Sequence, residues 1–301
     1  MANSMSPAPL SRAELYAHAD AFLDALAARD ASRLPWAEHV VFTENNVQLG
    51  VGDGVWNTAT AVPRDYDLKA ADPATGQVCW FGHVVEGPDT SVMALRLQVT
   101  GGRIAEAEAM ICRPHELGPF PVIDPERRPR EILLADVPEG QRMARERMVS
   151  LANGYFDTLQ LNDGTLFTHF TDDCDRIENG LQTTNVEIEG YPIAAMGTAD
   201  QFRLGQYKYD DRLRDRRFPL VDEEKGLVLA GGFIDHSGRL TEVTWTDGSR
   251  HDSIFHFPHS FALLELFKIT DGKIAAVEAA FVTVPYNMPS PWIAPQQYIV
   301  R

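Results

Sequence analysis

The spacing of hydrophobic side chains changes from a helical to a strand period along the chain, and this change occurs twice. In the first half, apolar residues every three or four positions predict a helix over Ser11–Arg29, with Ser11 and Glu14 forming a capping box at its start. A short helical turn at Asp30–Leu34 and a strand at His39–Glu44 follow. The next predicted elements are a helical piece at Trp56–Ala61 and strands at Tyr66–Lys69, Val78–Glu86, Ser91–Thr100 and Arg103–Arg113.

The second half repeats this order. It begins with a predicted helix at Gln141–Leu161, a short helix at Asp163–Phe170 and a strand at Cys174–Glu178. The remaining predicted elements are a helix at Thr198–Tyr207 and strands at Leu227–Asp235, His259–Thr270 and Lys273–Val284. The offset between matching residues grows from 133 at the first helices to 170 at the last hairpins, so the second copy carries insertions. We predict these insertions as loops, at Asp210–Arg217 and Thr241–Phe257.

Between the two copies lies a segment with six prolines in Pro114–Pro138. This density excludes a long regular element and predicts a linker that lies along the first domain. The predicted organisation is a first domain at residues 1–113, a linker at 114–140 and a second domain at 141–301, which ends in a tail rich in proline and aromatic residues.

Composition narrows the class of protein. The chain is 44% hydrophobic and 23% charged, with a net charge of -16, which disfavours nucleic acid and anionic membranes as partners. Cys79, Cys112 and Cys174 are an odd number of scattered thiols, so we predict them to be free, reduced and buried. The N-terminal residues lack a signal-peptide pattern, and no apolar run approaches the ~18 residues of a membrane span. We therefore expect a cytoplasmic protein.

One strand carries unusual charges. In Asp172–Gln182, counting by twos places Arg176 and Glu178 on one face, where such a pair is costly to bury unless it is paired or used in chemistry. Both copies contain the motif E-N-x-x-Q, starting at Glu44 and at Glu178, but Phe42 stands where the second copy has Arg176. We interpret the first copy as structural and the second as the site of chemistry, although a structural bridge from Arg176 to a neighbouring Asp is the alternative.

Further candidates lie in the second half. His256 or His259, in the second insertion and at its end, can act in proton transfer at a pocket mouth, unless they belong to a solvated loop. Residues predicted to line the pocket are His259, Asn179, Tyr207, Lys208 and Phe261. No metal site is predicted, because no carboxylate spacing completes a recognised ligand set. Glu108 and Glu278 match across the copies and suggest a shared structural salt bridge.

This order of elements, ending in D-G-K-I-x-x-x-E at Asp271–Glu278, resembles the nuclear transport factor 2-like fold. That group is also called SnoaL-like, and it includes polyketide cyclases and ketosteroid isomerase. The resemblance covers roughly residues 11–113 and 142–284. It implies an α+β protein of two tandem domains, each a curved antiparallel sheet wrapped around helices to form a conical pocket.

The second copy is also similar to the start of ketosteroid isomerase, through Tyr155–Leu159 followed by Asp172–Glu178. The similarity implies an oxyanion-hole tyrosine at Tyr155 and a general-base carboxylate at Glu178. The second oxyanion donor of the isomerase, a protonated Asp, would fall near Leu264 or Glu265.

The motifs F-T-E-N in the first copy and R-I-E-N-G-L-Q-T-T in the second resemble two-copy proteins, most of all the sphingomonad diarylpropane lyases. This resemblance implies loss of formaldehyde from a 1,2-diarylpropane-1,3-diol, giving a stilbene, with no cofactor and a small aromatic substrate. The predicted catalytic residues are Glu178, Tyr155, Arg176 and His256. The alternatives are an isomerase or dehydratase acting on an aromatic or polyketide-like substrate, and a non-catalytic ligand-binding or protein-interaction module. We also expect either a homodimer or an intramolecular pairing of the two copies.

Overall fold

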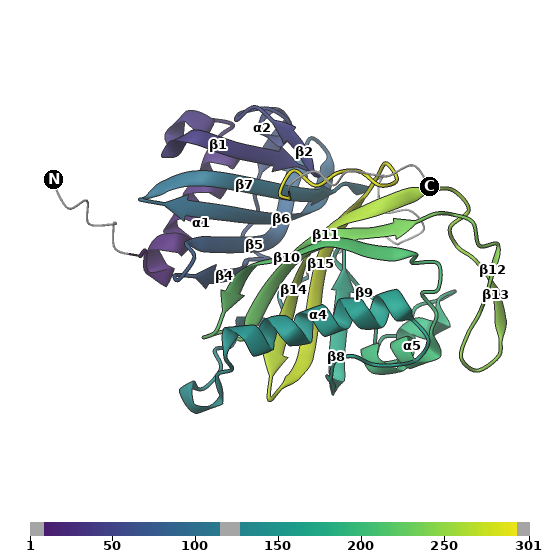
Figure 1. Cartoon of the computed structure of the whole chain (residues 1–301). Helices are drawn as coiled ribbons and strands as arrows, with labels where there is room; N and C mark the ends of the chain where they lie inside the picture. The colour runs from purple at the N-terminus through teal and green to yellow at the C-terminus, as the bar shows by residue number, and fades with distance from the viewer. Residues whose placement is uncertain (1–8, 115–126, 294–301) are drawn as a thin grey trace.

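The computed structural model describes residues 9–114 and 127–293. It contains two α+β halves, each with one long helix packed against one face of a curved sheet (Figure 1). The predicted fold class, two tandem nuclear transport factor 2-like domains, is confirmed by this architecture. Residues 115–126 of the predicted linker and 294–301 of the tail lie outside the described part, and the domain boundaries stay a prediction.

The first half is built on a sheet with strand order β2-β1-β7-β6-β5-β3, in which β4 also pairs with β5. Its strands are β1 (Trp36–Glu44), β2 (Val47–Leu49), β3 (Ala59–Ala61), β4 (Leu68–Asp72), β5 (Gln77–Glu86), β6 (Asp89–Thr100) and β7 (Arg103–Cys112). Its helices are α1 (Arg12–Ala27), η1 (Ala31–Arg33) and α2 (Val55–Thr58). Strands β1 and β7 run parallel, whereas the other pairs are antiparallel.

The second half has the order β10-β11-β14-β15-β8-β9, again with one parallel pair, β8 with β15. Its strands are β8 (Phe170–Glu178), β9 (Leu181–Gln182), β10 (Arg212–Asp222), β11 (Leu227–His236), β14 (His259–Thr270) and β15 (Lys273–Val284). A separate hairpin, β12 (Glu242–Thr244) and β13 (Arg250–Asp252), projects from one end (Figure 1). The helices after the first half are α3 (Glu131–Leu134), η3 (Glu139–Gln141), α4 (Arg145–Leu161), η4 (Pro192–Ala195) and α5 (Thr198–Leu204).

The two long helices begin and end for local reasons. In α1 the predicted capping box is present, because Ser11 N donates to Glu14 Oε2 at 2.8 Å and Glu14 N donates to the Ser11 hydroxyl at 3.3 Å. Helix α4 ends at Asn162, whose left-handed backbone (φ 45°) stops the helix. The Asn162 side-chain oxygen then accepts from Tyr207 N at 2.9 Å, which fixes the segment after α5 against the end of α4.

The two sheets pack against each other through the faces that the long helices do not cover. One apolar cluster contains Phe81 and Met110 from the first half together with Leu229, Leu264 and Val282 from the second. The expected intramolecular pairing of the two copies is therefore present. This seam leaves the helix-covered face of each sheet as a separate interior.

Two ion pairs cross the seam reciprocally. Arg12, the first residue of α1, donates twice to Asp222 at 2.6 Å, and Arg145, the first residue of α4, donates twice to Asp72 at 2.7 and 2.8 Å. Each carboxylate also accepts a backbone N–H from the other half, Asp222 from Ala71 and Asp72 from Val221. The contact from α1 to the second half is thus matched by an equivalent contact from α4 to the first half, as in a two-fold interface between identical subunits.

Three sequence predictions are wrong in detail. Asp163–Phe170 forms no helix, because the Asp163 carboxylate accepts from Thr165 N in a local turn and β8 begins at Phe170. The predicted loop insertion Asp210–Arg217 lies largely in β10, whose ladder with β11 has two register shifts that disturb the alternation of side chains. Trp56–Ala61 divides into the end of α2 and the strand β3.

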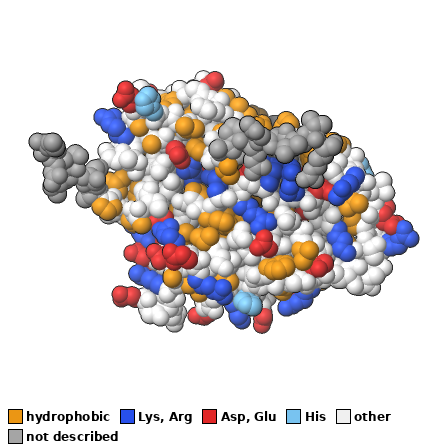
Figure 2. Space-filling model, in the orientation of Figure 1, with side chains coloured by type: hydrophobic (Ala, Val, Ile, Leu, Met, Phe, Trp, Pro, Cys, Tyr) orange, Lys and Arg blue, Asp and Glu red, His pale blue; other side chains and the backbone are white. Residues whose placement is uncertain are grey.

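The surface seen in Figure 2 carries acidic and basic side chains interspersed with scattered hydrophobic ones. The net charge of -16 is therefore not gathered into one patch on this face. The predicted burial of Cys79, Cys112 and Cys174 is confirmed, and Cys79 and Cys174 are free thiols. Within the described residues, no helix is both long and apolar enough to span a membrane.

Candidate active site

Two carboxyl groups extend into the second interior from one row of the sheet. Glu178 on β8 pairs with Ala279 on β15, and Ala279 pairs with Glu265 on β14. Residues paired directly across strands point to the same face, so Glu178 and Glu265 share the face that α4 covers. Glu265 is buried, whereas about a quarter (24%) of the Glu178 side chain is exposed.

Arg176 lies two residues before Glu178, on the same face, and is fully buried. Its Nε is 3.2 Å from Glu178 Oε1, and its Nη2 donates to Gln201 Oε1 at 2.6 Å and to the Tyr207 hydroxyl. The alternative bridge from Arg176 to a neighbouring Asp is wrong, because Asp175 pairs with Arg130 instead. Arg176 therefore holds Glu178 as one half of an ion pair, within a network that fixes the guanidinium.

Tyr155 on α4 reaches the second carboxyl group. Its side chain interacts electrostatically with that of Glu265, and both side chains are buried. Burial, together with the nearby charge of Glu178, raises the pKa of Glu265 to about 8, and burial raises the pKa of Tyr155 well above its usual value. At neutral pH the interior therefore presents a protonated carboxyl and a phenol side by side, two donors that can stabilise developing negative charge.

Aromatic side chains pack at the end of this interior where β11 ends. Tyr207 and Tyr209 follow α5 and are half-buried, and the rings of Phe261 and Phe281 lie 5.0 Å apart. Beside them His236, at the end of β11, is buried with Nδ1 3.1 Å from Asp210 Oδ1. The combination of flat apolar walls and a few polar groups is typical of a site for an aromatic ligand.

The remaining predicted site residues lie in different surroundings. His259 is buried with its ring 4.6 Å from that of His236, whereas His256 is exposed on the loop before β14. Lys208 Nζ donates to Thr244 O at 2.6 Å, toward the β12–β13 hairpin. The amide of Asn179 both donates to and accepts from the backbone of Phe281, at 3.0 and 2.9 Å.

The shared Asn of the E-N-x-x-Q motif has the same structural role in both copies. Asn179 (φ 50°) and Asn45 (φ 48°) both adopt a left-handed backbone at the end of their strand. Asn45 bridges the backbone of Ile111 as Asn179 bridges that of Phe281, at 3.1 and 2.7 Å. The Asn thus ends the strand and ties it to the last strand of its sheet.

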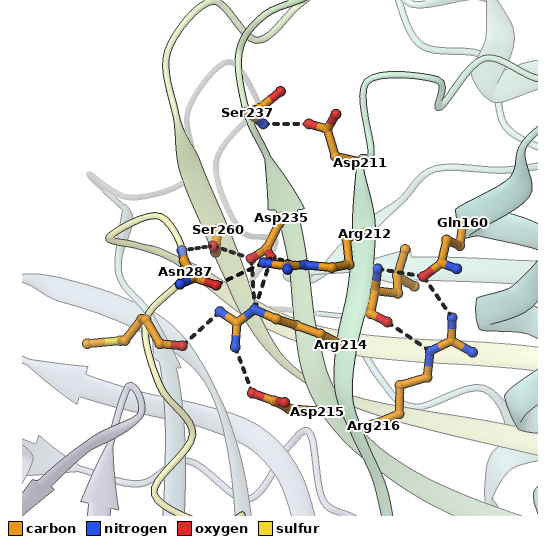
Figure 3. Close-up of polar contacts among 12 residues, drawn as sticks. Gln160, Asp211, Arg212, Arg214, Asp215, Arg216, Asp235, Ser237, Ser260 and Asn287 are labelled. Carbon is orange, nitrogen blue, oxygen red and sulfur yellow. Dashed lines mark hydrogen bonds and ion pairs between the residues drawn. The ribbon is translucent and has the colours of Figure 1, made fainter. Parts of the chain in front are cut away.

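A network on the seam-facing side of β11 fixes the end of the strand that carries His236. Figure 3 shows Arg212, Arg214 and Ser260 converging on the buried carboxylate of Asp235. Asn287, in the segment after β15, contacts both Arg212 and Ser260. Strands β10, β11 and β14 are therefore joined at the rim of the interior.

A family model matches residues 8–111 and 141–281, which is most of the chain in two segments. The chain belongs to the family described as a domain of unknown function (DUF8021). A comparison with curated proteins gives no match.

Several solved structures are similar to parts of this DUF8021 chain at low sequence identity. AclR from Streptomyces galilaeus, provisionally described as a hydroxylase, is 14% identical over 38% of this chain and 91% of its own, with a TM-score of 0.30. A protein of Kribbella flavida DSM 17836, provisionally described as a ketosteroid isomerase, is 18% identical over 42% and 91%, with a TM-score of 0.29. An NTF2-like protein of Cytophaga hutchinsonii ATCC 33406 is 17% identical over 46% and 100%, with a TM-score of 0.26.

Several residues of the DUF8021 site escaped sequence reasoning. The sequence placed the second oxyanion donor near either Leu264 or Glu265, because a shift of one residue along the strand decides which side chain faces Tyr155. In the structure Leu264 faces the seam and Glu265 faces Tyr155. Asp210 and His236 are brought together by the end of β11, and no short motif marks them.

The matched acids Glu108 and Glu278 have different partners, so their predicted shared salt bridge is wrong. Glu108 accepts from Arg96 at 2.8 Å, whereas Glu278 is buried in the seam, which raises its pKa to about 7.

A cleft of about 460 Å³ opens at the other end of the second half. Its lining includes Phe170, which stacks on Phe202 at 5.7 Å and lies 6.2 Å from the ring of Tyr155. Phe170 thus lines the cleft on one side and faces the ring of Tyr155 on the other. Within the described residues, no group of three or more His, Cys, Asp or Glu side chains is placed to hold a metal ion.

Proposed function

We propose that the second interior is the active site of a cofactor-independent carbon–carbon lyase that removes formaldehyde from a 1,2-diarylpropane-1,3-diol. One arrangement carries this proposal: Glu178, ion-paired with Arg176, and the buried Glu265, whose pKa is raised to about 8, extend from one row of the sheet beside Tyr155. A buried carboxyl with a raised pKa and a second carboxyl held in an ion pair can supply an acid and a base to the same ligand.

The reaction divides into two proton transfers. Glu265 gives its proton to the benzylic hydroxyl, which leaves as water and produces a quinone-methide-like electron sink. Glu178 then takes the proton of the terminal CH2–OH group. The electrons of the carbon–carbon bond form the new double bond, and the terminal carbon departs as formaldehyde. The products are a stilbene, formaldehyde and water, which together account for every atom of the diol.

Tyr155 and Arg176 serve orientation in this scheme. The Tyr155 hydroxyl, next to Glu265, positions the leaving oxygen, and Arg176 holds Glu178 through its ion pair at 3.2 Å. The half-buried rings of Tyr207, Phe261 and Phe281 provide flat walls for the aryl groups.

The test is formaldehyde release from a phenolic 1,2-diarylpropane-1,3-diol by pure, metal-stripped protein, followed together with stilbene absorbance. We expect equimolar formaldehyde and stilbene. If neither product appears while the protein remains folded, the lyase proposal is wrong. A Glu178→Gln variant that kept full activity would remove Glu178 from the scheme.

A second candidate function is supported by the Tyr155–Glu265 pair. A phenol and a neutral carboxylic acid beside a carboxylate base match what the resemblance to ketosteroid isomerase implies. This arrangement suits proton abstraction next to a ketone, in an isomerase or dehydratase. Deuterium exchange at the α-carbon of an aromatic ketone, measured by NMR in the absence of aldehyde release, would favour this function. Ligand binding with neither reaction would indicate a binding module.

A further inference from the structure

The Asp210–His236 pair takes no part in the two proton transfers described above. His236 Nδ1 lies 3.1 Å from Asp210 Oδ1 and 3.3 Å from the carbonyl oxygen of Tyr209. A ring nitrogen that faces two acceptors carries the proton, so Nε2 on the opposite side of the ring is a hydrogen-bond acceptor.

This acceptor is buried, and it makes no hydrogen bond within the described residues. His236 is 1% exposed. Buried polar side-chain atoms in proteins are normally hydrogen-bonded, so one that points away from its carboxylate partner without a donor marks a place where a ligand donor fits.

The groups around Nε2 define the ligand. The ring of His236 lies 4.4 Å from that of Phe255, 4.8 Å from Phe261 and 4.6 Å from His259. Phe261 in turn lies 5.0 Å from Phe281. We call these five rings the aromatic collar: His236, Phe255, His259, Phe261 and Phe281. Flat ring walls around one acceptor suit an aromatic ring that carries a hydroxyl group.

We propose that the aromatic collar binds a phenol, whose hydroxyl donates to His236 Nε2 while Asp210 holds the imidazole in position. This inference rests on the proposed function in placing a phenolic ligand in the second interior, and it names the group that receives the phenolic hydroxyl.

A proton-transfer role follows for the lyase reaction. When the phenol gives its proton to His236 Nε2, the imidazolium faces the Asp210 carboxylate. The electron pair left on the phenolic oxygen helps to expel the para-benzylic hydroxyl, which leaves as water with the proton from Glu265. When the carbon–carbon bond breaks, its electrons restore the aromatic ring and the phenolate recovers its proton from His236. No external oxidant or reductant is needed.

The test compares p-cresol with its O-methyl ether, 4-methylanisole, which has nearly the same shape but no donor hydrogen. Binding is followed by NMR, with the imidazole nitrogen signals of His236 as a local report. We expect p-cresol to bind about fivefold more tightly, the effect of one neutral hydrogen bond. We also expect the Nε2 signal to shift with p-cresol and not with the ether.

His236→Phe keeps an aromatic ring in the collar and should abolish the preference for p-cresol. Asp210→Asn, a change of similar shape, should reduce it. His251→Gln is the matched control: His251 stacks on Trp245 in the β12–β13 hairpin, and its loss should leave the preference unchanged. Equal affinity for the two probes in the unaltered protein, or a preference that persists in His236→Phe, would overturn the inference.

The outcomes separate this inference from the lyase proposal. Preferential p-cresol binding without formaldehyde release would refute the lyase and support the phenol site. Formaldehyde release with equal binding of both probes, and equal turnover of phenolic and O-methylated diols, would refute the phenol site alone.

Discussion

The two interiors of this protein are built on sheets of similar topology and differ in the side chains that fill them. One row of paired residues runs across each sheet in the same register. In the second sheet the row is Glu178, Ala279, Glu265 and Ala230. In the first sheet it is Glu44, Ala109, Leu95 and Trp80. The two sheets therefore keep the same strand register although their side chains differ. Leu95 stands in the first sheet where the second has Glu265, and Trp80 stands where the second has Ala230.

The one acid common to both rows has different partners. Glu44 Oε2 accepts from Val55 N at 2.6 Å at the start of α2, and Oε1 accepts from Arg113 at 2.9 Å. The approach is close, because a Cβ on Gly54 (φ 62°) would lie 2.3 Å from Glu44 Oε2. Glu44 is thus part of the scaffold, whereas Glu178 has Arg176 as its partner and remains partly exposed.

The sharpest way to break this comparison is to remove the acid from each row. Glu178→Gln should lower formaldehyde release by about 10²–10⁴-fold, the usual contribution of a positioned acid–base group. Glu44→Gln should leave the turnover of the folded protein within about twofold, because in this scheme Glu44 contacts no reacting atom. The measurement is kcat on the diol, with circular dichroism to confirm folding. Comparable loss in both variants would contradict the division of roles.

The tryptophan of the first row provides a stability test. Trp80 is fully buried, and Trp80→Ala should lower the free energy of unfolding by about 3–5 kcal/mol through lost contacts and a residual cavity. At the matched place in the second row, Ala230→Leu should instead narrow the site and weaken binding of aromatic ligands. Denaturant titration and ligand titration, respectively, provide the two readings. If Trp80→Ala left the free energy of unfolding unchanged, packing around Trp80 would not stabilise the first interior.

The reciprocal pairs across the seam should be equal in effect. Asp72→Ala and Asp222→Ala each leave an arginine and a backbone N–H without their carboxylate, so each should cost about 3 kcal/mol. Asn replacements keep the shape and should cost less. Urea unfolding of the four variants measures this. If the Asp72 and Asp222 variants lost strongly different free energies of unfolding, the two ion pairs would be alike in geometry but not in their contribution to stability.

The last prediction concerns the dependence of stability on pH. The pKa of Glu265 is raised in the folded state to about 8, above ~4.3 in an unfolded chain, so between these values the folded protein holds the extra proton. Stability should therefore fall as pH rises through this window, by about 1.4 kcal/mol per pH unit for this one group. Glu265→Gln should remove that slope, whereas Leu95→Met, at the matched position, should not change it. Urea midpoints between pH 5 and pH 8 measure both.

Sequence periodicity was sufficient for the two-copy architecture because helices and hairpins are local. The capping box at Ser11 and the strands His259–Thr270 and Lys273–Val284 all depend on neighbouring residues. Strand β10 was missed because its arginines hide the apolar alternation and its ladder shifts register twice.

The site was harder to predict, because long-range pairing decides its composition. Glu265 joins Glu178 only through Ala279 on the strand between them. His236 and Asp210 meet where β11 ends, 26 residues apart in the chain. The histidines that stood out in the sequence belong to a conspicuous H-D-S-I-F-H-F-P-H stretch, yet His256 in it is exposed on a loop.

The reciprocal pairs Arg12–Asp222 and Arg145–Asp72 have a consequence for divergence. In a dimer of identical chains every substitution appears twice, so a residue that fills one interior fills both. Once both partners belong to a single polypeptide, that constraint disappears while the interface geometry stays. One half can then take on tryptophan and leucine and act as a rigid support, and the other can retain buried acids that weaken its own stability.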